Sequence, residues 1–317
     1  SAMTSLRRHL EEHFIFAALV ILIVFFGLTT DNFFSWVTVT TILNQLPALT
    51  AVTVGMTLVL IVAGIDLSVG SVLGFCSTVV GVAMMTLGLP VPVAALLGII
   101  AGLACGLFNG ALVARLALPS FIVTLGMLEM ARGMSSLTTG SQTVYIGADI
   151  QWIALPIPII GVSIALLISV ALVVIAQFVL TRPVFGRHLI AIGTNEKAAM
   201  MSGIDARPYR IAVFALSGAL AGVAGIFNTA YLGSADPNAG FGLELSAIAA
   251  AVIGGTSLMG GRGSVIGAFA GVLIIAVLQN GLAQLGATEP TKRLITGAVI
   301  VIAVLIDRWR ASSRRGG

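Results

Sequence analysis

The sequence is dominated by apolar runs of the length that a helix needs to cross a membrane. About 20 consecutive apolar residues span the ~30 Å hydrocarbon core of a bilayer. Hydrophobic residues make up 58% of the chain and charged residues 9%, whereas charged residues are about 25% of a soluble domain. The sequence therefore predicts an all-α polytopic membrane protein with about ten transmembrane helices. The runs are at residues 14–30, 44–63, 67–88, 90–113, 118–137, 157–180, 211–232, 244–260, 264–286 and 291–307.

The basic residues predict which side of the membrane each loop faces. If the N-terminus is cytoplasmic, thirteen of the sixteen Lys and Arg residues fall on the cytoplasmic side, because Arg132, Lys292 and Arg293 are the other three. This distribution satisfies the positive-inside rule. Both termini are therefore predicted to be cytoplasmic. The net charge of +4 is explained by topology, and no patch of interleaved aromatic and basic residues indicates nucleic-acid binding.

The segments assigned to the outer side are too short for a second domain, since the longest is residues 138–156. We expect a cytoplasmic segment at 1–13, which starts with a cloning remnant, and a single transmembrane domain at 14–307. A basic cytoplasmic tail follows at 308–317. Any binding or energising module must then be a separate chain.

One carboxylate lies among glycines inside this apolar sequence. The stretch from Gly55 to Gly74 contains Asp66, with Gly64 and Gly70 on either side. A charge at bilayer depth costs at least ~2.5–3.5 kcal/mol on insertion scales, so it marks a functional or architectural residue. Glycines at this density let a helix open where protein or a water-filled cavity covers the freed backbone. The stretch predicts a broken or re-entering helix.

The role of Asp66 stays open between several readings. It can cap the third span by accepting the amides of Ser68 and Val69, contact a second subunit, act as a gate, or contact the transported solute. Glu129 and Arg132 stand three residues apart on the fifth span. They therefore share one helix face and either pair with each other or line a path.

A second glycine-rich stretch, Ala247 to Gly267, echoes the first. Gly254 and Gly255 precede the hydroxyls of Thr256 and Ser257, and a new span follows. Paired interruptions in two halves of a chain are typical of transporters near their translocation path. Small residues at these positions can instead serve only close helix packing.

The cytoplasmic segment at 181–210 contains the signals of a short helix. Thr194 can cap a helix over Asn195 to Ser202, and Gly203 can end it in the left-handed conformation. Such a helix with small apolar side chains suits docking into a groove of a soluble partner.

Three separated motifs carry a family resemblance. GMTLVLIVAGIDLSVGS, FGRHLIAIGTNEKAAMMSGI and ELSAIAAAVIGGTSLMGGRGSVIG occur in this order and resemble the ribose-type permeases of bacterial ABC importers. The resemblance implies a multi-pass permease subunit of the bacterial inner membrane, surrounded by membrane lipid. Its implied partners are a second permease subunit, identical or paralogous, a periplasmic sugar-binding protein and a cytoplasmic ABC ATPase. It also implies a coupling helix that rests on the ATPase, formed here by Gly193, Asn195, Glu196, Ala198, Ala199, Ser202, Gly203 and Ile204.

The residues predict no enzymatic site. The glycine-rich stretch Gly254 to Gly263 lacks the Lys and the Ser or Thr that complete a phosphate loop, so ATP and Mg would be used by the partner ATPase and no cofactor by this chain. No Ser, Cys or metal-ligand set faces His9, His13 or His188, so no catalytic or metal residue is expected.

Two function classes remain, and the cytoplasmic helix favours the permease. In the alternative, an ion-coupled secondary transporter, Asp66 or Glu129 would bind the coupling proton or cation, but such a carrier needs no ATPase docking surface. A scaffold without transport would need no glycine breaks. We assign the translocation path or gate to Asp66, Ser68, Ser71, Asn109, Glu129, Arg132, Asn228, Thr256, Ser257 and Asn280. Because the spans offer scattered amides and hydroxyls without an aromatic platform, we expect the permease itself to bind sugar no more tightly than about millimolar.

Overall fold

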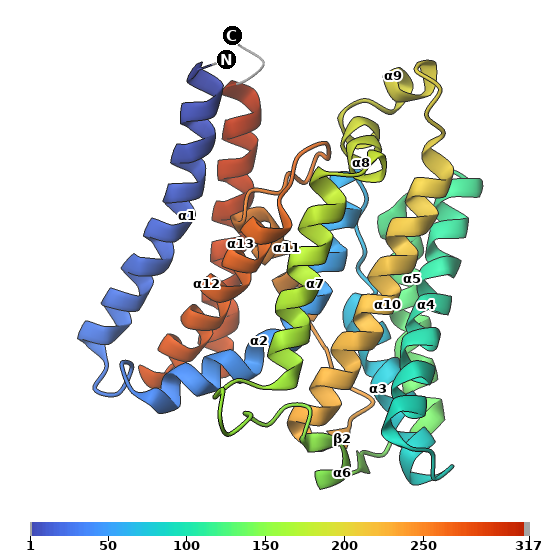
Figure 1. Cartoon of the computed structure of the whole chain (residues 1–317), viewed down its shortest axis with the longest axis vertical. Coiled ribbons are helices and arrows are strands. Elements are labelled where there is room, and N and C mark those ends of the chain that lie inside the picture. The colour runs from blue at the N-terminus through green and yellow to red at the C-terminus, as the bar shows by residue number, and fades with distance from the viewer. Residues whose placement is uncertain (1, 314–317) are drawn as a thin grey trace.

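The computed structural model describes the backbone of residues 2–313 and the side chains of residues 13–309 and 312. Its helices and its two short strands are arranged as one elongated bundle (Figure 1). The two strands pair antiparallel, with Val144 opposite Ala235. The elements are α1 (Ala2–Thr29), α2 (Trp36–Ile61), α3 (Val69–Met85), α4 (Val91–Arg115), α5 (Ser120–Thr139), β1 (Val144–Tyr145), α6 (Ala148–Gln151), α7 (Ile164–Thr181), α8 (Val184–Thr194), α9 (Glu196–Met201), α10 (Ala206–Leu232), β2 (Ser234–Ala235), α11 (Leu243–Ile253), α12 (Val265–Gln284) and α13 (Glu289–Ser313).

Each of the ten apolar runs overlaps one helix, and five helices in the described residues are long and apolar enough to cross a membrane. These five are α2, α4, α7, α10 and α12. The run 244–260 is not one continuous helix, because α11 has only 11 residues, or about 16 Å of length. The chain is therefore a mostly helical, strongly apolar protein, and the number of crossings stays a prediction.

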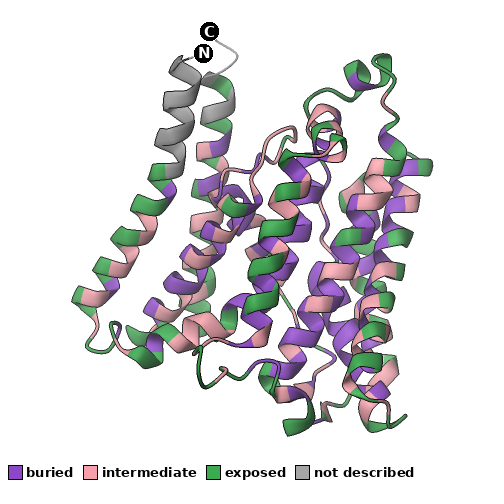
Figure 2. Ribbon diagram, viewed as in Figure 1, coloured by how far each residue is buried: buried purple, intermediate pink, exposed green. Residues whose placement is uncertain are grey.

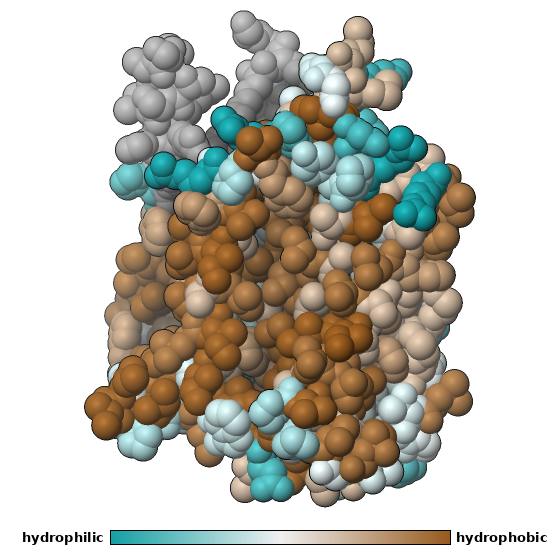
Figure 3. Space-filling view, turned by 45° about the vertical axis from the view of Figure 1, so that its right-hand side comes forward, coloured by the Kyte–Doolittle hydropathy of each residue, from teal (hydrophilic) through white to brown (hydrophobic). Residues whose placement is uncertain are grey.

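The chain has two polar ends separated by an apolar belt. The start of α1, the end of α13, α8 and α9 lie at one end, which we call the α9 end, whereas α6 and β2 lie at the opposite β2 end (Figure 1). The space-filling view shows hydrophobic side chains between two more polar rims (Figure 3). Helix α1 begins at Ala2, so the segment expected at 1–13 is helical from there. Ser1, Arg314, Arg315 and the side chains of Arg7, Arg8 and Arg310 lie outside the described residues.

The centre of the bundle is built on close contact between α4 and α10. A Cβ on Gly102 would collide with the Gly218 carbonyl, and a Cβ on Gly218 with that of Gly102. Gly106 faces the backbone of α10 in the same way. Glycine at facing positions lets two helix backbones touch. Inside a membrane the hydrophobic effect does not drive helices together, so this close van der Waals packing supplies the stabilisation. Figure 2 shows buried residues concentrated in this central part of the bundle.

Replacing Gly102 by Val should separate α4 from α10. Overpacking a well-packed core costs typically ~1–3 kcal/mol, and here the obstacle is a backbone carbonyl that cannot rotate away. We expect a lower melting temperature for the purified protein in detergent, measured by intrinsic fluorescence. The matched control is Gly297→Val on α13, where a Cβ meets nothing within 4 Å. Equal melting temperatures for the two variants would contradict the role of the Gly102 contact.

Candidate functional site

Two non-helical segments lie inside the bundle, and α3 connects them: it follows the first and contacts the second. The first break, residues 62–68, joins α2 to α3, and the second break, residues 236–242, joins β2 to α11. A Cβ on Gly70 would collide with the Gly240 carbonyl, and a Cβ on Gly74 would lie 2.8 Å from the Ala239 carbonyl oxygen. The start of α3 therefore rests directly on the second break, and glycine is needed on the α3 side of this contact.

Hydroxyl groups of α5 satisfy the backbone of the first break. Ser120 Oγ accepts the Ile65 amide at 3.0 Å, and Thr124 Oγ1 accepts the Leu67 amide at 3.0 Å. Thr124 is fully buried. Non-helical backbone at membrane depth requires such partners, so α5 holds the first break open in a defined shape.

Asp66 lies at the centre of a buried polar cluster. Its Oδ1 accepts the Ser68 amide at 2.9 Å and the Ser68 hydroxyl at 2.6 Å, while its Oδ2 accepts the Ser217 hydroxyl at 2.8 Å. Asn109 Nδ2 donates to Ser68 Oγ at 3.1 Å. The cluster thus ties the first break to α4 and α10.

This geometry agrees in part with the predicted cap, because Asp66 accepts the amide just before α3 but not that of Val69. With 1% of Asp66 exposed, the carboxylate reaches no surface of the single chain. The dimer, gate and solute-contact readings stay predictions. Sequence reasoning missed Ser217, since nothing marks one serine of an apolar helix as the partner of a carboxylate 151 residues away.

The expected ion pair between Glu129 and Arg132 is absent from the described ion pairs. Arg132 Nη1 instead donates to the carbonyls of Pro237 at 2.9 Å and Ala239 at 2.8 Å, and Ser135 Oγ also donates to Pro237. The Pro237 and Ala239 carbonyls accept no helical hydrogen bond, so they need the Arg132 guanidinium as a donor. Arg132 therefore bonds to them and not to Glu129, which lies one turn away on the same helix. Arg132 therefore does for the second break what Ser120 and Thr124 do for the first.

Glu129 points away from the bundle. It lies midway along α5, is exposed, and forms no hydrogen bond or ion pair with the residues that the structure describes. Gly126 and Gly133 on the same helix have open space where a Cβ would stand. We call Gly126, Glu129, Met130 and Gly133 the α5 face.

The two glycine-rich stretches contact each other at the α9 end. Gly261 donates its amide to the Ile61 carbonyl at 2.8 Å, and a Cβ on Gly260 would lie 2.7 Å from the Ala63 Cβ. A Cβ on Gly193 of α8 would collide with the same Ile61 carbonyl. The end of α2, the glycine loop at 254–264 and α8 therefore form one junction without room for side chains.

Asp307 fastens the end of α13 to this glycine loop. Its Oδ1 accepts Arg262 Nη2 at 2.6 Å, and its Oδ2 lies 3.4 Å from Ser257 Oγ. Only 6% of Asp307 is exposed. The neighbouring Thr256 Oγ1 is buried without a hydrogen-bond partner among the described residues. Of the predicted path residues, Thr256 and Ser257 thus belong to the α9 end of the bundle.

The segment at 181–210, which the sequence predicted to be cytoplasmic, forms two helices before α10, α8 and α9, instead of the one expected. Thr194 is the last residue of α8 and bonds to the Ile190 carbonyl, so the predicted cap at Thr194 is wrong. Asn195 caps α9 by accepting the Ala198 amide at 3.0 Å, because its extended backbone separates the two helices. Gly203 follows with a φ of +84°, as the sequence predicted.

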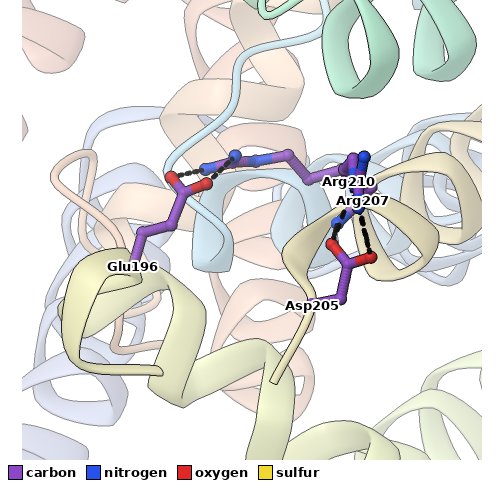
Figure 4. Close-up of polar contacts among 4 residues, drawn as sticks. All are labelled: Glu196, Asp205, Arg207 and Arg210. Carbon is purple, nitrogen blue, oxygen red and sulfur yellow. Dashed lines mark hydrogen bonds and ion pairs between the residues drawn. The ribbon is translucent and has the colours of Figure 1, made fainter. Parts of the chain in front are cut away.

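Two ion pairs hold α9 and the start of α10 in place (Figure 4). Glu196 forms a two-point pair with Arg210 at 2.7 and 2.8 Å, while Asp205 pairs with Arg207 and also caps α10. Ala199 packs on Ile192 and Ala206. The side chains of Met200 and Met201 are exposed at the tip.

A cavity of about 310 Å³ lies beside the second break, toward the β2 end. The predicted path residue Asn228 lines it, and Asn280 adjoins it by donating to Gln45 Oε1 at 2.9 Å. Phe227, Tyr231 and Phe241 form part of the wall, so the expectation of no aromatic platform is wrong. The predicted Ser71 is buried in α3 and does not line this cavity.

Comparisons with known proteins place the chain in a family. The family model described as "Branched-chain amino acid transport system / permease component" matches residues 38–304. The chain belongs to this permease family. The ribose import permease protein RbsC of Escherichia coli (strain K12) is 39% identical to this permease, covering 92% of this chain and 91% of that one. The predicted resemblance is confirmed.

Other relatives of the permease are named for other solutes. The fructose import permease protein FrcC of Rhizobium meliloti is 36% identical and covers 92% of this chain and 83% of its own. The autoinducer 2 import system permease protein LsrC of Salmonella choleraesuis is 35% identical over 94% of this chain and 86% of that one. No solved structure matches.

Substitutions of Asp66 should separate its architectural role from proton transfer. In Asp66→Asn, the amide oxygen can still accept from Ser68 and the amide nitrogen can donate to Ser217, so folding and much of the transport should remain. In Asp66→Leu, buried donors lose their acceptor at about 1–3 kcal/mol each, and the permease should fail to fold or assemble. Gel filtration, thermal melting and transport in proteoliposomes check both variants. Complete loss of transport in both, with intact assembly and a pH-dependent wild type, would instead indicate ion coupling.

Proposed function

We propose that this chain is the permease subunit of an ATP-driven monosaccharide importer in a bacterial inner membrane. In this proposal two permease subunits enclose the path, a periplasmic binding protein delivers the sugar, and a cytoplasmic ATPase uses ATP and Mg to drive import. The proposal is supported by family membership and by relatives named for ribose, fructose and D-allose import.

The observation that carries the proposal is the form of α9. This helix of six residues stands at one polar end of the molecule, with Met200 66% exposed and Met201 87% exposed. Methionine side chains adapt to grooves on partner surfaces. A capped helix braced by a two-point ion pair and tipped with apolar side chains is suited to docking on a soluble ATPase.

The route from α9 into the bundle runs through α8. Gly193 of α8 touches the Ile61 carbonyl, which also accepts the Gly261 amide. Ile61 is the last residue of α2 and immediately precedes the first break. A displacement of α9 by an ATPase would therefore press on the end of α2 and on the glycine loop together, which is a direct mechanical path to the first break. The second break would be reached only through the start of α3, where Gly70 touches Gly240.

Disturbing α9 should uncouple ATP hydrolysis from sugar transport while the permease still inserts. Glu196→Lys would face Arg210 with a like charge, and Gly203→Val would strain a position with a φ of +84°. We expect at least about a tenfold lower ratio of sugar transported to ATP hydrolysed in proteoliposomes containing the full complex. Normal coupling in both variants would contradict the assignment of α9.

Two controls sharpen this test. Glu289→Lys reverses a charge of a comparable exposed pair away from α9 and should leave coupling unchanged. The double change Glu196→Arg with Arg210→Glu restores opposite charges and should recover coupling.

Because hydrogen bonds from Arg210 lower the pKa of the Glu196 carboxyl, the pair is intact at neutral pH and is lost only as the pH falls through that lowered value.

The α5 face supports the proposed second subunit. A carboxylate at mid-membrane almost always faces protein or a water-filled cavity, yet Glu129 is exposed in the single chain. Gly126 and Gly133 leave space for close approach of another helix. A second permease subunit opposite this face would enclose Glu129 in a polar path between the two copies.

Cysteine cross-linking tests this arrangement. In a Cys76→Ala, Cys105→Ala background, Met130→Cys should cross-link two permease copies with a short bifunctional maleimide. Val174→Cys on α7, which is exposed to 59%, should not cross-link. Native mass spectrometry establishes the dimer independently. A dimer in which Met130→Cys reacts no better than Val174→Cys would rule out the α5 face as the interface.

A further inference from the structure

The cavity beside the second break is lined by uncommitted polar groups. Asn44 of α2, and Asn228 and Tyr231 of α10, line it, and their side chains form no hydrogen bond with any residue that the structure describes. Each carboxamide can both donate and accept, as can the tyrosine hydroxyl. Polar side chains left without partners in a mainly apolar protein are available to a ligand.

Aromatic side chains supply the apolar part of the same cavity. Phe227 is almost fully buried, whereas Tyr231 and Phe241 are exposed to 44% and 77%. Concave sites for small molecules typically combine apolar and aromatic walls with a few polar groups, in volumes from about 300 Å³ upward. This cavity, at about 310 Å³, suits one small molecule.

None of the described residues that line the cavity carries a charged side chain. Its other lining residues are Gln45, Pro47, Ala48, Leu49, Leu73, Ala154, Ser163, Ala165, Gly240 and Leu243. A zwitterionic amino acid in such a site would leave its ammonium and carboxylate without ionic partners, which is costly away from water. A neutral polyol needs donors, acceptors and an apolar surface, and the cavity offers all three.

The position of the cavity connects it to the breaks. Gly240 and Phe241 belong to the second break, and Gly240 touches Gly70 at the start of α3. The cavity also borders the end of α10 and the start of α7, both at the β2 end and away from α9 (Figure 1). The cavity thus lies at the β2 end of the molecule, beside the contact between α3 and the second break.

We propose that this cavity is a low-affinity subsite for a neutral monosaccharide, with Asn44 and Asn228 bonding to sugar hydroxyls and the aromatic side chains covering the C–H face of the ring. The inference rests on the proposed function, and it goes further by excluding amino acids from this permease although the family description names them. The affinity is expected to be about millimolar, since few of the groups converge and the cavity is partly open.

Direct binding is measured by saturation-transfer NMR on the permease in lipid nanodiscs. The probes are D-ribose, D-fructose, D-allose and, as the zwitterionic comparison, L-leucine. We expect at least one sugar to bind near millimolar concentration and L-leucine not to bind. Asn228→Ala and Asn44→Ala should each weaken sugar binding about three- to tenfold, the effect of one lost hydrogen bond. Tyr231→Phe, which keeps the ring shape, should weaken it less.

The matched control is Asn238→Ala, an exposed asparagine of the second break that does not line the cavity; it should bind sugar like the wild type. Sugar binding unchanged in Asn44→Ala, Asn228→Ala and Tyr231→Phe, or binding of L-leucine instead of sugar, would overturn the subsite.

Transport by the assembled complex distinguishes a failure of the subsite from a failure of the proposed function. If the complex imports a sugar while the cavity variants match the wild type in KM and selectivity, only the subsite fails. If the wild-type complex imports none of the sugars, the proposed function fails.

Discussion

The architecture depends on one requirement, which is that every backbone polar group opened inside an apolar bundle must find a partner there. The first break takes its partners from Ser120 and Thr124 of α5, and the second takes them from Arg132 and Ser135 of the same helix. One helix therefore satisfies both breaks. The cost of unsatisfied amides and carbonyls in lipid explains why α5 is the most polar of the central helices and why its inner face carries hydroxyls and a guanidinium.

The glycines have a related role in bringing these elements into contact. Gly70 and Gly74 let α3 rest on the second break, whereas Gly193, Gly260 and Gly261 let α8 and the glycine loop reach the end of α2. In these contacts backbone meets backbone, with no side chain between the two elements. The proposed sequence of events, from an ATPase at α9 to a sugar cavity at the β2 end, passes through these contacts.

The proposed division between sugar recognition at the cavity and energy coupling at α9 is supported by the positions of the charged side chains. The described residues that line the partly open cavity carry no charge, which suits weak binding of a neutral solute. Charged side chains instead form hydrogen bonds outside the cavity. Arg132 is bound to carbonyls, Asp66 to serines, and Asp307 to Arg262. Each of these charges fixes a segment of chain, and Glu129 alone among the named mid-helix charges faces outward.

The sequence by itself determined the class of the protein, because the length of its apolar runs leaves few alternatives to helices in a membrane and its three motifs carry the family. The sequence also determined local features that depend on neighbours in the chain. Examples are the left-handed Gly203, the break around Asp66 and the hydrogen bond from the Ser68 amide to the Asp66 carboxylate. Only the tertiary structure decided the partners. Arg132 bonds to Pro237 rather than Glu129, Asp66 accepts a hydrogen bond from Ser217, and Phe227, Tyr231 and Phe241 line the same cavity as Asn44. These partners depend on which helices pack together although they are more than a hundred residues apart in the chain. Apolar spans of similar composition contain nothing that indicates which other span each will contact.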